Sequence, residues 1–399
     1  MPDQAAAGRT RFLLLYALAW AGGSVAYVPF LTILLPVRVS AMVGAGAGSG
    51  QDVVWLSTIA FFGAIAASIS HIGFGYLSDV TRNRRGWITL GLLLSCGLLL
   101  GLRQATSLPQ IVALVLMWQI GLNMMLAPLS AWAADCVPNS HKGLLGGLLA
   151  FAPGLGALAG VFVTIPGLAS PDGRLALVAL IVAACVLPVL LHGAPAPLHE
   201  PEAPERAQGS QPLDRKGAAL RMWCARLLVQ VAEAALFSFL YLWFRSLDPA
   251  TGDYLAARVF SLVLVLSAPV ALLTGRWADR HARPLTPLVV CTLVAPFGLV
   301  GMALSQSLTP AIASYALFGF STSIFLALHS AQTLRTLPDS RRRGRDLGLF
   351  NLTNTMPSLV MPWFTLALVP SFGFSGLFLL FAGLALVAAL LLLSFGKEN

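Results

Sequence analysis

One acidic residue, Glu233, falls near the middle of a long apolar segment at residues 218–246, whereas the other acids lie in predicted loops, tails, a linker or segment ends. A charge at the centre of a bilayer costs ~2.5–3.5 kcal/mol, so such a residue indicates a function by default. Gln230 and Phe237 share its helical face and are candidates for substrate binding. Burial favours the protonated carboxyl, and alternate exposure to the two sides would let it bind and release a proton. The alternative is a neutral or paired glutamate that only holds helices together.

Amides, hydroxyls and aromatic rings lie at similar depth in three other apolar segments. Gln119 and Asn123 are four residues apart, so they face the same way and could bind hydroxyl groups of a ligand. The alternative is interhelical hydrogen bonding worth ~0.6 kcal/mol each. His329 is a candidate second proton site or a hydrogen-bonding residue at a helix end. The further candidates for ligand contact are Tyr27, Trp118 and Thr322.

Long apolar helices must position these residues. The chain of 399 residues is 57% hydrophobic and 10% charged, which is typical of a polytopic helical membrane protein. Each apolar run has ~20 residues, enough to cross ~30 Å of hydrocarbon. We predict an all-α membrane protein whose twelve transmembrane helices lie roughly at 12–36, 53–78, 87–103, 109–136, 144–165, 173–193, 218–246, 254–278, 285–306, 309–336, 347–369 and 372–396.

The net charge of +9 comes from an uneven distribution of basic residues. Most of the 25 Lys and Arg residues fall in loops that share one side of the membrane if both termini do. The positive-inside rule makes that side the cytoplasm, which predicts a multi-pass protein of the inner (plasma) membrane with both termini cytoplasmic. Contact with the lipid bilayer therefore explains the charge, and no nucleic-acid partner is expected.

Two motifs recur 200 residues apart, which indicates duplicated halves. Residues 75–79 (GYLSD) are echoed by 275–279 (GRWAD), and residues 137–142 (VPNSHK) by 337–342 (LPDSRR). Parallel repeats in a membrane chain are typical of transporters whose site lies between the halves. We predict six-helix bundles at 1–193 and 218–399, related by pseudo-twofold symmetry and joined by a flexible cytoplasmic linker at 194–217.

Several function classes are not supported by the residues. The five cysteines show no CxxC or metal-like spacing, and no phosphate-binding loop or nucleophile–base pair is visible, so neither an enzyme nor a cofactor is expected. Gly156 and Gly160 form a GxxxG pattern that suits packing within one chain. We therefore expect a monomer whose partners are a small-molecule substrate and protons.

Residues 75–85 (GYLSDVTRNRR) resemble the signature loop between spans two and three of the major facilitator superfamily. The resemblance implies the major facilitator fold and a cytoplasmic charge cluster in the outward-facing state. In that cluster Asp79 would cap the eleventh helix and pair with basic residues, with Asp135 as a second acid. The residues expected in this cytoplasmic gate are Asp79, Arg82, Arg84, Arg85, Asp135, Asp279, Arg280, Arg283 and Asp346.

The Ser-Asp-x-Thr-Arg-x-Arg variant of the loop is similar to the branch of sucrose/proton symporters and glycoside-pentoside-hexuronide cation symporters. Residues 344–357 (GRDLGLFNLTNTMP) are similar to a stretch that enters span eleven of related bacterial transporters. This similarity adds Asn351 and Asn354 to the candidates for substrate binding. Val80 and Ser358 depart from the family pattern. Span two has no acid in its upper or middle part, which favours proton over sodium coupling.

The leading expectation is a proton-coupled secondary active transporter of a small polar solute, sugar-like or glycoside-like, that works by alternating access with Glu233 as proton carrier. An alternative is proton-driven efflux of a drug-like or metabolite compound, which an apolar aromatic cavity with one carboxylate would suit. A third hypothesis, from another class, is a non-transporting membrane scaffold or assembly factor on the same fold. That protein would not need a titratable group at mid-depth.

Overall fold

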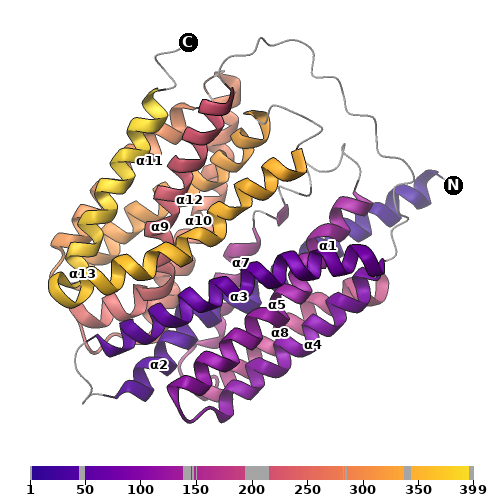
Figure 1. The fold of residues 1–399 in the computed structure, drawn as a ribbon, viewed down its shortest axis with the longest axis horizontal. Coiled ribbons are helices and arrows are strands. Elements are labelled where there is room, and N and C mark those ends of the chain that lie inside the picture. The colour runs from indigo at the N-terminus through magenta and orange to yellow at the C-terminus, as the bar shows by residue number, and fades with distance from the viewer. Residues whose placement is uncertain are drawn as a thin grey trace. The chain divides into compact units, whose positions relative to one another are not determined.

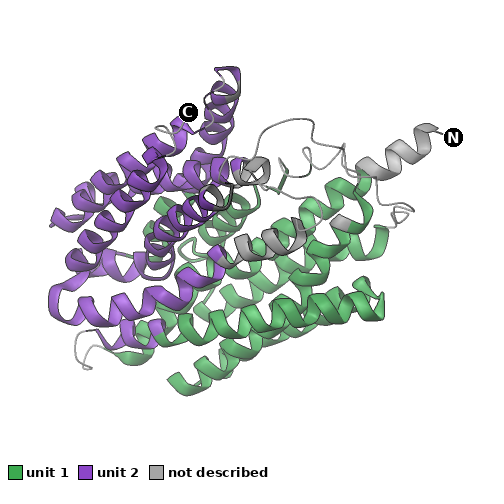
Figure 2. Cartoon of the chain, turned by 45° about the horizontal axis from the view of Figure 1, so that its top comes forward, with its two compact units in different colours: residues 1–47, 58–201, 252–261 green, residues 48–57, 202–251, 262–399 purple. Residues whose placement is uncertain are grey.

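A computed structural model describes residues 2–44, 50–137, 145, 148–149, 151–193, 215–281, 283, 285–336 and 343–394. All of the regular structure in this part of the chain is helical (Figure 1). Side chains are described from Arg11 onward, with gaps around the segments that fall outside these ranges. Contacts within the chain divide it into two units, residues 1–47, 58–201 and 252–261 and residues 48–57, 202–251 and 262–399 (Figure 2).

Unit 1 is built from helices of the first half of the chain. Its elements are α1 (Pro2–Pro29), the π-helical turn η1 (Phe30–Leu34), α2 (Leu35–Val43), α3 from residue 58 of Gln51–Thr81, α4 (Arg84–Gly101), η2 (Leu102–Gln104), α5 (Leu108–Cys136), α7 (Ala152–Val163), α8 (Pro171–His192) and the start of α10. The helix α4 packs along α5, and α1 packs against α7 and α8. Gly91 allows the close contact of α4 with α5, because a Cβ there would lie 2.4 Å from the backbone nitrogen of Met125.

Unit 2 has its core between helices of the second half. Its elements are α9 (Arg215–Leu247), most of α10 (Asp253–Arg280), α11 (Thr286–Leu304), α12 (Leu308–Thr336) and α13 (Arg343–Leu393). The helix α9 packs against α12 and α13, and α11 packs against the same two helices. Apolar side chains from all four of these helices form one buried cluster: Met222, Ala225, Val229, Leu288, Phe325, Ala388 and Leu392.

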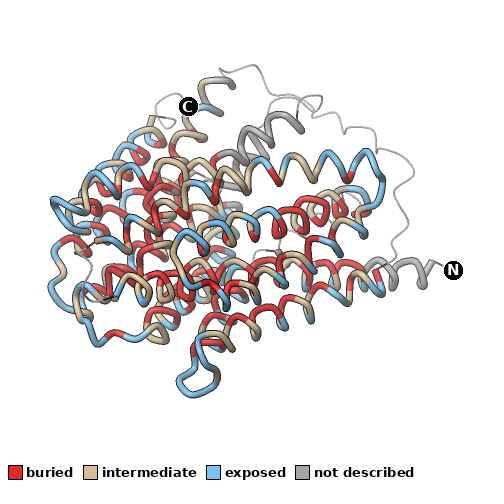
Figure 3. Tube along the Cα trace, turned by 60° about the horizontal axis from the view of Figure 1, so that its bottom comes forward, coloured by how far each residue is buried: buried red, intermediate tan, exposed pale blue. Residues whose placement is uncertain are grey.

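Many large apolar side chains on the helices are exposed. Figure 3 shows how buried and exposed stretches alternate along the trace of these helices. Ten helices among the described residues are long and apolar enough to cross a membrane, and the shorter α7 is also apolar. Large outward-facing residues such as Ile72, Leu180 and Phe297 suit a lipid environment, where apolar surface has no cost. The chain is thus a multi-pass helical membrane protein.

The predicted count of twelve helices is not confirmed. The predicted span 144–165 is described continuously only from residue 151, and its helix is Ala152–Val163. The predicted spans 347–369 and 372–396 fall within α13, which consists of two helices that meet at a kink at Gly373, where φ is 62°. Only two residues separate these spans in the sequence, so the helical pattern continues up to the glycine and resumes directly after it. The predicted linker 194–217 lies almost entirely outside the described residues.

Candidate functional site

One face of α9 carries a row of polar and aromatic side chains in unit 2. Arg226, Gln230, Glu233 and Phe237 are spaced by four, three and four residues, which places them on the same side of the helix. The row begins inside the apolar segment Leu220–Leu247, which is long enough to span a membrane. A helix forms here because runs of Ala, Leu and Phe bury its other faces. Arg226 and Glu233 therefore both lie inside a helix that is apolar and long enough to span a membrane.

Arg226 joins three helices of unit 2 through neutral oxygen atoms. Its residue surface is only 7% exposed. The Nε atom donates to Oε1 of Gln230 at 3.1 Å, one terminal nitrogen donates to the carbonyl of Leu326 in α12 at 3.4 Å, and the other donates to Oδ1 of Asn354 in α13 at 3.1 Å. Hydrogen bonds to a charged donor are the strong ones, so this set fixes the guanidinium plane.

Gln230 and Arg226 meet at the same acceptor. Nε2 of Gln230 donates to Oδ1 of Asn354 at 3.1 Å, which is the atom that also receives the Arg226 bond. Asn354 is exposed at the surface of the unit, whereas Gln230 is half-buried. The structure thus brings together two of the predicted ligand residues, Gln230 and Asn354, and adds an arginine between them. We call Arg226, Gln230 and Asn354 the α9–α13 cluster.

Glu233 lies one turn beyond Gln230 and is half-buried. Its carboxyl group makes no hydrogen bond or ion pair with any residue in the described part of the chain. It does interact electrostatically with Arg226 and with the buried Tyr315 of α12. The carboxyl can therefore change its protonation state without breaking a described hydrogen bond, while the energy of that change depends on the nearby guanidinium.

His329 and Thr322, both predicted on α12, are buried in unit 2. Nε2 of His329 lies 2.9 Å from the backbone carbonyl of Met222. Because a carbonyl only accepts, that nitrogen is the donor and the ring ties α12 to α9. Thr322 donates back to the carbonyl of Gly319 at 3.3 Å. The His329 bond links two helices, as the hydrogen-bonding alternative to a proton site predicts, whereas the Thr322 bond stays within its own helix.

A second polar group lies in unit 1, between α3 and α5. Nδ1 of His71 lies 3.2 Å from Oδ1 of Asn123, and Nδ2 of Asn123 donates to the carbonyl of Gln119 at 2.9 Å. The side chain of Gln119 lies beside Gly63 of α3. The two amides that the sequence paired thus lie on the side of α5 that meets α3, where His71 is the partner of Asn123 and Gly63 lies beside Gln119.

The predicted aromatic contacts of unit 1 take different positions. Trp118 is fully buried and packs edge-on against Phe30, with ring centroids 4.7 Å apart. Phe30 begins the π-helical turn in which α1 passes into α2, and such turns often occur at functional sites. Tyr27 is half-buried one turn earlier. Trp118 is therefore a packing residue of the unit, and Tyr27 has the more accessible side chain.

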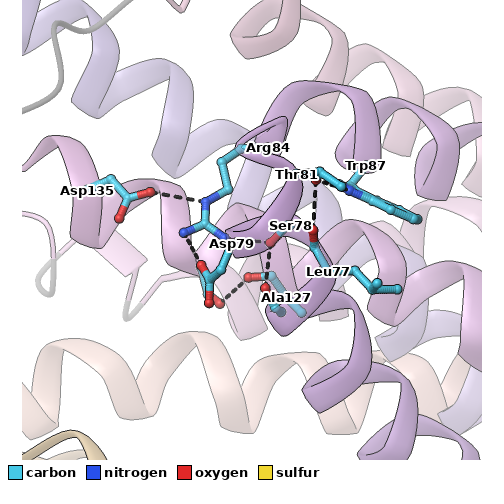
Figure 4. A network of polar contacts seen from close by, with 10 residues as sticks. Leu77, Ser78, Asp79, Thr81, Arg84, Trp87, Ala127 and Asp135 are labelled. Carbon is cyan, nitrogen blue, oxygen red and sulfur yellow. Dashed lines mark hydrogen bonds and ion pairs between the residues drawn. The ribbon is translucent and has the colours of Figure 1, made fainter.

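The turn between α3 and α4 holds a group of charges around Arg84 (Figure 4). The guanidinium pairs with the carboxylate of Asp79, and its Nε lies 3.1 Å from Oδ2 of Asp135 in α5. It also donates to Oγ of Ser78 at 2.5 Å. The turn itself is closed by Asn83, which caps α4, and by a bond from Trp87 to Thr81. We call Asp79, Arg84 and Asp135 the α3–α4 cluster.

The other predicted gate residues are less connected in the described part of the chain. Arg85 lies over the ring of Trp132 at 5.4 Å, and Arg82 occupies the turn with a positive φ of 49°. Arg280 and Arg283 are exposed at the end of α10 and just beyond it. The side chains of Asp279, Asp346 and Asn351 lie outside the described residues, as does the predicted capping of the eleventh helix at that end of α13.

Sequence reasoning did not select Arg226 or the contact of His71. Arg226 is not among the site residues predicted above, although its spacing from Gln230 and Glu233 places it on their helical face. That helical spacing was the signal that could have found it. His71 and Asn123 are 52 residues apart in the chain. Only the packing of α3 on α5 reveals that they meet.

Comparisons with known proteins agree with this architecture. The model of the Major Facilitator Superfamily matches residues 12–339 and also residues 222–398. No curated protein sequence matches the chain. Among solved structures, a bacterial homolog of the human lysosomal transporter Spinster, inward-facing and unoccupied, is similar with a TM-score of 0.71 and 14% identity over 99% of this chain and 98% of that chain.

A second solved structure is an auto-inhibited peptide transporter of the POT family. It has a TM-score of 0.72 and 14% identity, over 98% of this chain and 97% of that chain. Likeness at this identity shows the fold alone, while the family model covers most of the sequence. The chain belongs to the Major Facilitator Superfamily, and it is a multi-pass membrane transporter of small molecules, not an enzyme.

Proposed function

We propose that the protein is a proton-coupled secondary active transporter of a small polar organic solute, with Glu233 as the proton carrier. One observation carries this proposal: a half-buried carboxyl in the middle of a candidate membrane helix bonds to no described residue and interacts with a buried guanidinium. A carboxyl that only held helices together would need a hydrogen-bond partner there, because an unsatisfied buried polar group is costly.

The polar side chains near α9 and α5 suit a solute that carries hydrogen-bonding groups, as a sugar or glycoside does. Gln230 and Asn354 lie beside Glu233 in unit 2, while Gln119 and Asn123 lie on α5 in unit 1. Amides offer both donors and acceptors, which is what hydroxyl groups require.

The α3–α4 cluster has the composition of a gate. Its two carboxylates and one guanidinium are held by residues at helix ends, where an ion pair can form and break with a change of conformation. We propose that this end of unit 1 faces the cytoplasm of a cell whose inner membrane holds the protein, since most loop arginines lie on the same side. Breaking the cluster would then accompany alternating access.

The experiment begins with purified protein and a thermal-shift screen of sugars, glycosides and organic acids. Solutes that stabilise the protein are then tested for uptake into proteoliposomes under an imposed pH gradient. Glu233→Gln is expected to abolish gradient-driven accumulation while exchange of solute across the membrane continues. Glu233→Asp, which keeps a carboxyl group, is expected to retain coupling. A Glu233→Gln transporter that accumulates solute at the rate of the unchanged protein would sink the proposal.

A further inference from the structure

Two hydrogen-bond donors in unit 2 point at one oxygen atom of an exposed side chain. The terminal nitrogen of Arg226 and Nε2 of Gln230 each lie 3.1 Å from Oδ1 of Asn354. A charged fork and an amide that converge in this way form the donor arrangement that binds a carboxylate oxygen. Asn354 is exposed, so its amide can move away, whereas Arg226 is buried and fixed.

We propose that the α9–α13 cluster binds the carboxylate of an organic-acid solute, which displaces Oδ1 of Asn354 from the two donors. This inference rests on the proposed transport function and names its substrate class. In the structure, the neutral oxygen of Asn354 occupies the place of the anionic oxygen. Arg226 and Gln230 bind the carboxylate, and the bond of Arg226 to the carbonyl of Leu326 holds the guanidinium in place.

Charge balance gives Glu233 its part in this site. Glu233 and Arg226 attract one another electrostatically, so an ionised Glu233 competes with any incoming anion for the same positive charge. A proton taken from the solvent by Glu233 removes that competitor, and the carboxylate of the solute then balances Arg226. Acid and proton therefore bind together as an anion plus H⁺. The loaded site has the same net charge as the empty site with ionised Glu233, which avoids moving a net charge through hydrocarbon.

The same arrangement disfavours other solutes. A cation at the cluster would face a guanidinium whose position is fixed by three hydrogen bonds. A neutral hydroxyl could replace Oδ1 of Asn354, but it would gain no charge attraction. An anionic oxygen gains most, because hydrogen bonds between charged partners are roughly twice as strong as those between neutral groups.

The test uses carboxylic acids paired with their own amides, because the natural solute is not identified. The probes are benzoate with benzamide, lactate with lactamide, and N-acetylglycine with N-acetylglycinamide. Melting temperature and binding are measured on the full-length protein in detergent, and proton uptake is followed in weak buffer. The acids are expected to stabilise the protein, whereas their amides are not. About one proton is expected to be taken up per acid bound, because the carboxylate can pair with Arg226 only when Glu233 is neutral.

Three variants examine the cluster itself. Arg226→Gln is expected to weaken acid binding about tenfold or more. Arg221→Gln makes the same charge change on the same helix and is the matched control, which is expected to leave acid binding unchanged. Asn354→Asp places a fixed carboxylate where we expect that of the solute, so it is expected to abolish acid binding and raise the melting temperature. Asn354→Ala removes the competing oxygen and is expected to retain binding.

The outcomes separate this inference from the proposed function. If amides stabilise the protein as well as acids do, if no acid stabilises it, or if Asn354→Asp binds acids like the unchanged protein, the anion site is wrong. A neutral solute whose binding takes up a proton, lost in Glu233→Gln, would overturn the anion site and leave proton coupling standing. An acid that binds through Arg226 with no proton uptake would support the site and contradict Glu233 as the carrier.

Discussion

Arg84 of unit 1 and Arg226 of unit 2 are both held between helices, but their charges are balanced in different ways. The side chain of Arg84 is 16% exposed and pairs with two carboxylates that are themselves 60% and 46% exposed, Asp79 and Asp135. Arg226 is bound by two amide oxygens and a carbonyl, with Glu233 as its electrostatic partner. A helix end near water can thus hold an ion pair, while an embedded site uses neutral acceptors around the charge.

This difference suggests different roles for the α3–α4 cluster and for the site around Arg226. Exposed ion pairs contribute little to stability and are screened by salt, so the α3–α4 cluster can open at low cost. A buried guanidinium is costly to leave uncompensated, so under the proposed function we expect the protonation of Glu233 and the arrangement around Arg226 to change together. We expect the first cluster to control the rate of conformational change and the second to control what is bound and coupled.

The largest expected effect comes from breaking the pair at the embedded site. Arg226→Gln and Glu233→Gln are each expected to lower proton-driven accumulation roughly tenfold or more, at least ~1.4 kcal/mol on the free-energy scale. If the two groups act as one unit, the double variant has a rate of proton-driven accumulation no lower than that of either single variant. Initial rates in proteoliposomes with an imposed pH gradient measure all four proteins. Additive losses would show that the two charges work independently.

A smaller effect is expected at the α3–α4 cluster. Asp79→Asn removes one carboxylate of Arg84, and because that carboxylate is exposed the cost in stability is about 1 kcal/mol or less. The transport cycle is expected to slow several-fold while the equilibrium affinity for the solute stays the same. Asp135→Asn serves as the comparison, since it removes the other carboxylate. Loss of affinity with normal opening kinetics would contradict the assignment of this cluster to gating.

The sequence predicted the helical class and most of the helices, because runs of apolar residues long enough to span a bilayer have few other uses. In α13 the predicted break between the last two spans falls at residues 370–371, two residues before the non-helical Gly373. Gly373 reverses the backbone at φ 62°, close to Pro370, without a polar loop. Two helices thus meet inside one apolar run, so hydropathy predicts both of them but places the break between them only approximately.

The residues of the candidate site also differ in how far the sequence alone predicts them. Glu233 could be found from the sequence because a lone acid in an apolar segment is unusual whatever surrounds it. Arg226 could not be singled out in the same way, because basic residues are common in this chain and their distribution between the two sides of the membrane already explains most of them. Its hydrogen-bond partners among the described residues include Gln230, Leu326 and Asn354, which lie in three different helices, and the contact with Asn354 joins residues 128 positions apart. Such a contact depends on helix packing, which no local pattern of residues encodes.

The two units can also be compared by the stability that each loses when a close contact between its helices is disturbed. Gly91→Ala would place a Cβ 2.4 Å from the backbone nitrogen of Met125, and Gly298→Ala would place one 2.7 Å from that of Phe318. Each is expected to lower stability by about 1–3 kcal/mol, because the backbone must move apart. Gly97→Ala on α4 meets nothing within 4 Å and is the matched control. Thermal unfolding in detergent measures all three; an unaffected Gly91→Ala would contradict the tight α4–α5 contact.

The smallest expected effect concerns the tautomer of His71 in unit 1. Nδ2 of Asn123 donates to the carbonyl of Gln119, so Oδ1 of Asn123 faces His71 and accepts from its Nδ1–H. A neutral His71 is thereby held with its proton on Nδ1 and its Nε2 as an acceptor. Asn123→Leu removes this constraint at a stability cost of ~0.6 kcal/mol, and nitrogen NMR of labelled histidine is expected to show a shift toward the Nε2–H form. Gln119→Leu is the control, because the backbone carbonyl that orients Asn123 remains. A His71 signal that is the same in Asn123→Leu as in the unchanged protein would show that the histidine is oriented by something other than this amide.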